Sequence, residues 1–205
     1  MKPGKLDLLR ARTGFYFLIL SVFFYASSAF AYGYGEKEDP MATIFKSAVS
    51  SARAGQWGDV VKLADEGVAL QKGHLFEADK LVPKIRDSVT KKDVSATAAH
   101  LANMVYLSIR EKLWRNLKDG EGNFKTSKSR LAMARQSYLD VLDGNVKKQS
   151  PERSKAILEQ FDKALVAMGN PGVFGVGKKA ADPVAGEQAV KTIENLIERT
   201  FPGFK

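Results

Sequence analysis

Apolar residues recur at intervals of three and four from residue 40 onward, and no stretch alternates between apolar and polar positions for long. This spacing puts apolar side chains on one face of a helix, whereas a half-buried strand needs a period of two. The pattern therefore predicts an all-α protein with six or seven helices. Because the connections are short, we expect an antiparallel helical bundle. The expected helices cover 40–53, 60–70, a segment from about 74 past Pro83, 95–119, a segment through Leu131 that ends before Gly144, a segment from 151 and a segment from 183.

Three of these helices share a start signal, a short polar residue followed by proline. The polar side chain caps the first free N–H groups, and proline suits the first helical turn. Pro83 lacks an amide hydrogen, so it must either kink the third helix or mark a restart. The three start pairs are Asp39 with Pro40, Ser150 with Pro151, and Asp182 with Pro183.

The segment 95–119 is apolar on two sides, which is typical of a central helix. We expect its remaining polar strip to face solvent; the strip consists of Ser108, Lys112, Arg115 and Asp119. A later stretch, GNPGVFGVGKKAADP, is rich in glycine but lacks the spacing of a phosphate-binding loop. We expect it to be an ordered loop that packs Val173, Phe174 and Val176 against the bundle.

The N-terminus has the pattern of a secretory signal peptide. Four basic residues precede the uncharged run GFYFLILSVFFYA, which is too short to cross a membrane and is followed by small residues that end at Ala31. We expect 1–31 to be a cleaved signal peptide, 32–39 a flexible mature N-terminus, and 40–205 a single helical-bundle domain. The alternative is an uncleaved anchor that extends to Tyr34. A cleavable signal predicts a periplasmic protein.

The formal net charge is +9, and it is still +6 after removal of 1–31. A basic surface outside the cytoplasm can meet anionic lipid head groups or acidic proteins. No nucleic-acid-binding motif is present, and the basic residues are spread along the chain, as on solvated helix faces. The expected partners are an inner-membrane metal permease, another periplasmic protein or a membrane surface, and not a nucleic acid.

Two histidines and no cysteines leave few candidates for a metal site. His74 and Glu77 stand three residues apart in QKGHLFEADKLVPK, so on a helix both side chains would face the same way and could share one ion. The alternative is an ordinary first turn of a helix, where the helix dipole favours a carboxylate.

Glu111 is the third candidate ligand, and it follows His100 by eleven residues on one face of the long helix. The two are too far apart to bind one ion, although each could meet partners from neighbouring helices. The alternative is a hydrogen-bonded buried histidine, with Glu111 paired to Arg110 or Arg115. Met104 is expected to pack in the core and not to bind haem.

Catalysis has little support in the sequence. A cysteine nucleophile is excluded, and no serine or threonine lies in a nucleophile-elbow pattern. We expect a non-catalytic protein with no catalytic residues; the expected cofactor is iron or another transition-metal ion.

The segment REKLWRNLKDGEGNFKTSKSRLAMARQSYLDVLDGNVKKQSPERSKAILEQFDKALVAMGNPGVFGVG resembles the extracytoplasmic helical domain that accompanies high-affinity iron permeases. It is similar, more distantly, to imelysin-like periplasmic iron-uptake proteins. The likeness covers about residues 95–200 and implies a stand-alone periplasmic component linked to iron or another metal.

This chain departs from the motifs of both families. The permease motif Arg-Glu-x-x-Glu has its nearest counterpart at Arg110, Glu111 and Trp114, where the final glutamate is missing. The imelysin-like motif Gly-x-His-x-x-Glu becomes GHLFE, with Gly73 directly before His74.

Two functions from different classes follow. The first is a periplasmic accessory protein for metal uptake or handling, with His74, Glu77 and Glu111 as candidate ligands. Oxygen and imidazole ligands suit hard or borderline cations. The second is a metal-free helical adaptor that docks on an acidic protein partner or a membrane surface.

Overall fold

The computed structural model describes residues 38–119, 123–172 and 176–204. The predicted all-α class is confirmed, since helices make up most of these residues and only one isolated bridge, Asn170 with Lys179, joins extended segments among them. The predicted signal peptide, its cleavage site and the segment 32–37 lie outside the described residues. The helices are α2 (Pro40–Arg53), α3 (Trp57–Gln71), α4 (Val82–Thr90), α5 (Val94–Asp119), α6 (Phe124–Ser137), α7 (Asp143–Gln149), α8 (Pro151–Ala167) and α9 (Pro183–Thr200), with a 3₁₀ turn η1 (Asp79–Leu81) and a π-helical turn η3 (Tyr138–Leu142).

The three predicted polar-proline start signals are confirmed. Asp39 accepts a hydrogen bond from the Met41 N–H (3.1 Å) at the start of α2. Ser150 caps α8 and Asp182 caps α9 in the same way. Each proline occupies the first turn, where a backbone N–H would have no partner within the helix, so the missing N–H of proline costs no hydrogen bond. These starts were predictable because a cap depends on a few consecutive residues.

The predicted helix from His74 past Pro83 is wrong in its first half. The chain leaves α3 after Gln71, and residues 72–78 form turns and bends before η1 and α4. Gly73 has a left-handed φ of 75°, which interrupts the helix at a position where only glycine avoids strain. Pro83 lies in the first turn of α4, so the restart is the correct alternative.

The predicted helix through Leu131 does not end before Gly144. It consists of α6, the π-helical turn η3 and α7, and Gly144 lies inside α7. Asp143 helps to hold the π-helical turn, because its carboxylate accepts hydrogen bonds from Tyr138 Oη (3.1 Å) and Ser154 Oγ and pairs with Lys147 (2.7 Å).

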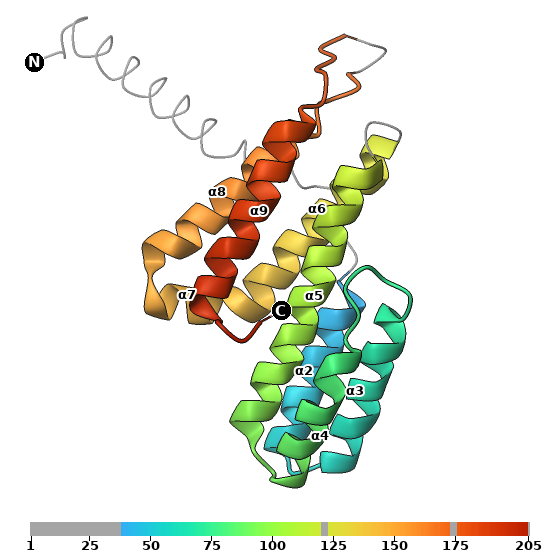
Figure 1. Cartoon of the computed structure of the whole chain (residues 1–205), viewed down its shortest axis with the longest axis vertical. Helices are drawn as coiled ribbons and strands as arrows, with labels where there is room; N and C mark the ends of the chain where they lie inside the picture. Colours follow the sequence, from blue (N-terminus) through green and yellow to red (C-terminus); the bar gives the residue numbers. More distant parts are fainter. Residues whose placement is uncertain (1–37, 120–122, 173–175, 205) are drawn as a thin grey trace, which may run out of the picture. The chain divides into compact units, whose positions relative to one another are not determined.

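Helix α5 is central, as the sequence predicts. It packs against α2, α3, α4, α6 and α9, and Figure 1 shows it running between the α2–α4 group and the α8–α9 pair. Met104, Val105, Tyr106 and Ile109 have no exposed surface. Met104 is therefore a core residue, as expected.

The predicted solvent-facing strip of this helix is partly wrong. Ser108 is buried and the Lys112 side chain is only 16% exposed, because the start of α2 covers them. Asp39 Oδ2 accepts hydrogen bonds from Lys112 Nζ (2.8 Å), Ser137 Oγ (2.8 Å) and Ser108 Oγ (3.4 Å). We call these four residues the Asp39 cluster; it joins α2 to α5 and α6.

The same cluster corrects the predicted flexible N-terminus at its last two positions. Asp39 is only 5% exposed, and Glu38 forms an ion pair with Lys46. The described helical body therefore includes Glu38, Asp39 and the cap of α2.

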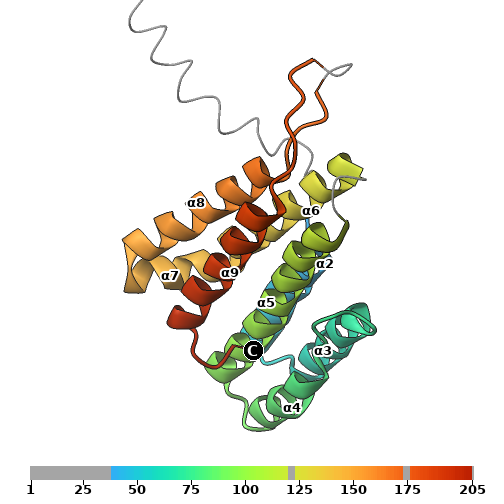
Figure 2. The ribbon, with the colours of Figure 1, turned by 45° about the horizontal axis from the view of Figure 1, so that its top comes forward.

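Helices α8 and α9 pack side by side and are joined by a segment that extends past their ends (Figures 1 and 2). We call the described residues of this segment, 168–172 and 176–182, the arm. Asn170 and Lys179 exchange two backbone hydrogen bonds (2.9 and 2.8 Å), and the Asp182 N–H donates to the Ala167 carbonyl oxygen (2.8 Å). The predicted packing of Val176 on the bundle is wrong, since this side chain is 79% exposed; Val173 and Phe174 lie outside the described residues.

Candidate functional site

His74 and Glu77 lie in the loop 72–78 and not on a helix, so they do not share a helical face. Glu77 is exposed, and its Oε1 accepts a hydrogen bond from the Gly73 N–H (3.0 Å). His74 is half-buried. The carboxylate of Glu77 therefore helps to close its own loop.

Glu111 meets the same loop from α5. Its Oε2 accepts a hydrogen bond from the Leu75 N–H (2.9 Å), and its Oε1 accepts one from Arg115 Nε. Burial raises the pKa of this carboxyl, but Arg115, the Leu75 N–H and nearby His74 together hold the pKa below its usual value. Glu111 thus has the ion pair with Arg115 that the simpler interpretation expected, and its role as a metal ligand stays a prediction.

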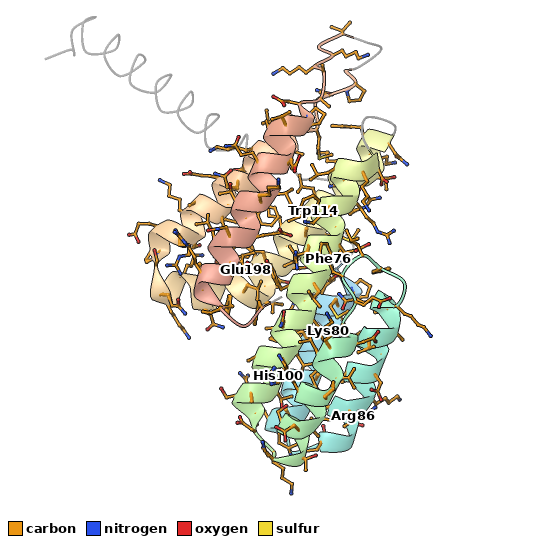
Figure 3. All side chains as sticks on the ribbon, in the orientation of Figure 1. Phe76, Lys80, Arg86, His100, Trp114 and Glu198 are labelled. Atoms are coloured by element: carbon orange, nitrogen blue, oxygen red, sulfur yellow. The ribbon has the colours of Figure 1, made fainter. Side chains whose placement is uncertain are left out.

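The loop is fixed on α5 by a second set of contacts. The guanidinium of Arg110 lies over the Phe76 ring, 4.0 Å from its centroid, and its Nε donates to Glu194 Oε1 on α9 (2.8 Å). Trp114 Nε1 donates to the same oxygen (2.8 Å). Figure 3 shows Phe76 beside α5, with Trp114 further along that helix.

The three predicted metal ligands thus lie in or against the loop 72–78 without forming a complete site. His74 interacts electrostatically with Glu111, while both Glu111 oxygens and one Glu77 oxygen accept hydrogen bonds. No group of three or more His, Cys, Asp or Glu side chains suited to a metal ion occurs among the described residues.

His100 lies toward the start of α5, away from Phe76 and Trp114 (Figure 3). Burial, with a smaller contribution from the positive charge of Lys84, lowers the pKa of its imidazole. Its separation from Glu111 agrees with the sequence-based expectation that these two do not bind one ion.

A pocket that the sequence analysis did not predict lies between the C-terminal part of α5, α6, α8, the arm and α9. It has a volume of about 210 Å³ and a mostly apolar wall. Small residues on the facing helices leave this space open; they include Ala164, Ala167 and Gly186. Leu113, Leu117 and Leu131 contribute larger apolar surfaces.

The wall of this pocket includes a polar side chain without a partner. Ser127 is only 3% exposed, and its Oγ makes no hydrogen bond with any residue that the structure describes. A buried hydroxyl left unpaired destabilises a fold by about 1–3 kcal/mol. The neighbouring Asn116 is fully engaged, because it donates to the Ser127 carbonyl oxygen (2.9 Å) and accepts from Arg130 (3.0 Å).

The arm forms the polar border of the pocket. Lys178 and Lys179 line it and are exposed. Asp182 also lines it, and one oxygen of its carboxylate accepts the capping N–H of Ala185 (2.9 Å). The border therefore carries two positive side chains and one carboxylate that caps α9.

Three exposed valines lie in or next to the arm in the sequence. Val166 lies in the last turn of α8 with 75% of its surface exposed, Val184 lies in the first turn of α9 with 77%, and Val176 lies in the arm. The sequence gives the valines but not their exposure, because a valine in a helix stripe is more often buried.

Comparison of this chain with protein-family models, characterised proteins and solved structures found no match. The resemblance to the extracytoplasmic domain of iron permeases and to imelysin-like proteins therefore stays a prediction. Among the described residues, every helix is too short or too polar to span a membrane.

Proposed function

We propose that this protein is an exported, non-catalytic helical adaptor that docks on an anionic membrane surface through the end formed by the arm. In this proposal a cleavable signal peptide delivers an antiparallel helical bundle to the periplasm. The observation that carries it is the exposure of three valines, in the last turn of α8, the arm and the first turn of α9, together with the exposed Lys178 and Lys179 of the arm.

Membrane docking combines two interactions that this end offers. Exposed apolar side chains gain free energy when they leave water for the interface, about 25 cal/mol per Å² of buried apolar surface. Lysines near an anionic surface add about 1 kcal/mol each. The net charge of +6 that remains after removal of 1–31 adds a long-range attraction. An acidic protein would satisfy the lysines but would leave the valines without an apolar partner, so we favour the membrane.

The test is sedimentation of the exported, processed protein with vesicles of phosphatidylcholine, with or without phosphatidylglycerol. We expect binding to the anionic vesicles alone, weakened by added salt. Replacing Lys178 and Lys179 with glutamate, or Val176→Asp, should abolish it.

The control has the same change in charge elsewhere. In this control, glutamate replaces two exposed lysines outside the arm. They are Lys62 on α3 and Lys155 near the start of α8. This variant should still bind. If the protein stays in the supernatant with both vesicle types at low salt, or if both double variants bind equally, membrane docking is wrong.

Metal handling is a second proposed function, favoured by the electrostatic contact of His74 with Glu111. An ion bound only to the folded state raises the melting temperature. We expect ferrous, ferric, copper or zinc ions to do so for the metal-stripped protein, and the double variant His74→Ala with Glu77→Ala to lose the shift. His100→Ala, which removes the other histidine, should keep it. An unchanged melting temperature with every ion would exclude this function.

A further inference from the structure

We propose that the pocket bordered by α5, α6, α8, the arm and α9 binds a medium-chain alkyl anion, with the chain inside and the anionic group at the lysines of the arm. This goes beyond membrane docking, because it assigns a soluble ligand to a cavity inside the protein. It rests on the size of the pocket, its aliphatic wall and the charge at the border.

The size of the pocket limits the chain. Its volume is about 210 Å³, which suits one short or medium alkyl chain. An apolar engineered cavity of about 150 Å³ binds benzene, which shows that pockets of this order hold small apolar ligands.

The wall offers contacts that suit an alkyl chain. Leu113, Leu117, Leu131 and Val190 line the pocket with aliphatic surface. Gly186 brings α9 close to the neighbouring helices, since a Cβ there would lie 3.3 Å from Leu117 Cδ2 and 3.6 Å from Ala167 Cβ. The floor is therefore built from small side chains that leave room for a chain.

Ser127 belongs to the wall of the pocket, but its Oγ is fully covered and makes no hydrogen bond with any described residue. The hydroxyl therefore does not define the polar group of the ligand, which is set by the border of the pocket.

The border of the pocket selects a negative group. Lys178 and Lys179 are exposed in the arm, and the Asp182 carboxylate is already used as the cap of α9. A carboxylate at the border meets two positive charges against one negative charge. A cationic head group on the same chain would be repelled.

The test is a calorimetric titration of the exported, processed protein with octanoate, butyrate and octylammonium below their micelle concentrations. Octanoate should bind saturably to one site. Butyrate and octylammonium should bind at least tenfold more weakly, since the first is too short for the pocket and the second has the wrong charge.

Variants separate this site from membrane docking. Ala164→Leu fills the pocket and should abolish octanoate binding while vesicle sedimentation is unchanged. Glutamate at both Lys178 and Lys179 reverses the charge at the border and should weaken octanoate binding at least tenfold. The Lys62 and Lys155 double variant should bind octanoate normally.

The proposal is overturned if octanoate produces no saturable heat, or if Ala164→Leu, with its melting temperature kept, binds it as before. If that variant does not fold, the Lys178 and Lys179 glutamate variant decides: unchanged octanoate binding in it is a negative result. Vesicle binding without octanoate binding would contradict the pocket alone, and octanoate binding without vesicle binding would contradict the docking function alone.

Discussion

At the scale of single residues, Asp39 has the most consequential position in the molecule. Its Oδ1 caps α2, and its Oδ2 accepts hydrogen bonds from side chains of α5 and α6. Asp39 is buried and Lys112 is mostly buried. Loss of either charge would therefore leave the other charge unpaired and poorly solvated.

We predict that Asp39→Asn destabilises the protein by about 3–5 kcal/mol, the usual cost of breaking a buried ion pair. Asparagine is as good a helix cap as aspartate, so the change isolates the charge. Urea unfolding of the processed protein measures it. The control is Asp65→Asn, which breaks the exposed pair with Arg86 and should cost at most about 1 kcal/mol. Equal losses in the two variants would mean that the Asp39 cluster adds no special stability.

Residue-level prediction succeeded where the partner is local. The caps at Asp39, Ser150 and Asp182 depend on the next three residues, and the sequence alone predicted them. The burial of Lys112 was missed, because the residue that covers it is 73 positions earlier in the chain. Helical periodicity identifies a polar strip but does not say which other segment lies on it.

At the scale of elements, the arm is fixed to the end of α8 by a glycine that tolerates no side chain. Gly169 has a φ of 72°, and a Cβ there would lie 2.6 Å from the Lys179 carbonyl oxygen and 2.8 Å from the Ala181 nitrogen. Gly177 has a similar φ of 75° but nothing within 4 Å. A side chain at Gly177 would therefore cause backbone strain alone, whereas a side chain at Gly169 would cause backbone strain and a steric clash.

We predict that Gly169→Ala destabilises the protein more than Gly177→Ala. Both variants bear the left-handed penalty of about 1–2 kcal/mol, but only the first also pushes a side chain into the backbone of residues 179–181 across the arm. Thermal unfolding gives the difference, and hydrogen exchange at the Asn170 and Lys179 amides reports whether the pair opens. Full protection of these amides in Gly169→Ala would show that the arm accommodates the side chain.

Some helix boundaries were predicted correctly from the sequence and others were not, for a physical reason. The helix predicted from about residue 74 begins only at η1 and α4, because contacts with α5 decide the conformation of the loop 72–78. Glu111 binds the Leu75 N–H and Arg110 packs on Phe76, and neither contact is visible from the loop's own sequence. The predicted His74 and Glu77 pair failed as a helical pair for the same reason.

At the scale of the whole molecule, resistance to acid depends in part on the buried Asp143. Burial raises the pKa of this carboxyl, but Lys147, Ser154 and Tyr138 outweigh burial and hold the pKa below its ordinary value. Between the two values the unfolded chain binds more protons, so the free energy of unfolding falls as the pH drops below about 4.

We predict that Asp143→Asn lowers stability at neutral pH and makes the acid-induced loss of stability shallower. The gap between the two proteins should narrow as the pH falls through the pKa of folded Asp143, since protonation removes the same charge from the wild type. Urea unfolding at a series of pH values measures both curves, with Asp65→Asn as the exposed control. A constant gap across that range would show that the carboxylate charge is not the cause.

The class of the fold was predictable from apolar periodicity, and so was the central place of α5, whose two apolar sides need neighbours. The pocket was not predictable. Its small wall residues look like ordinary bundle core in the sequence, and only the packing of α9 against α5 and α8 shows that they leave a space.

The Asp39 cluster also constrains the order in which the chain completes its structure. A protein that emerges from a ribosome or an export channel appears N-terminus first. Asp39 appears early, but Ser137, which bonds to it, follows 98 residues later. The start of α2 therefore remains without its full set of partners until α5 and α6 have emerged. A chain stalled before residue 137 would be open to proteolysis at α2.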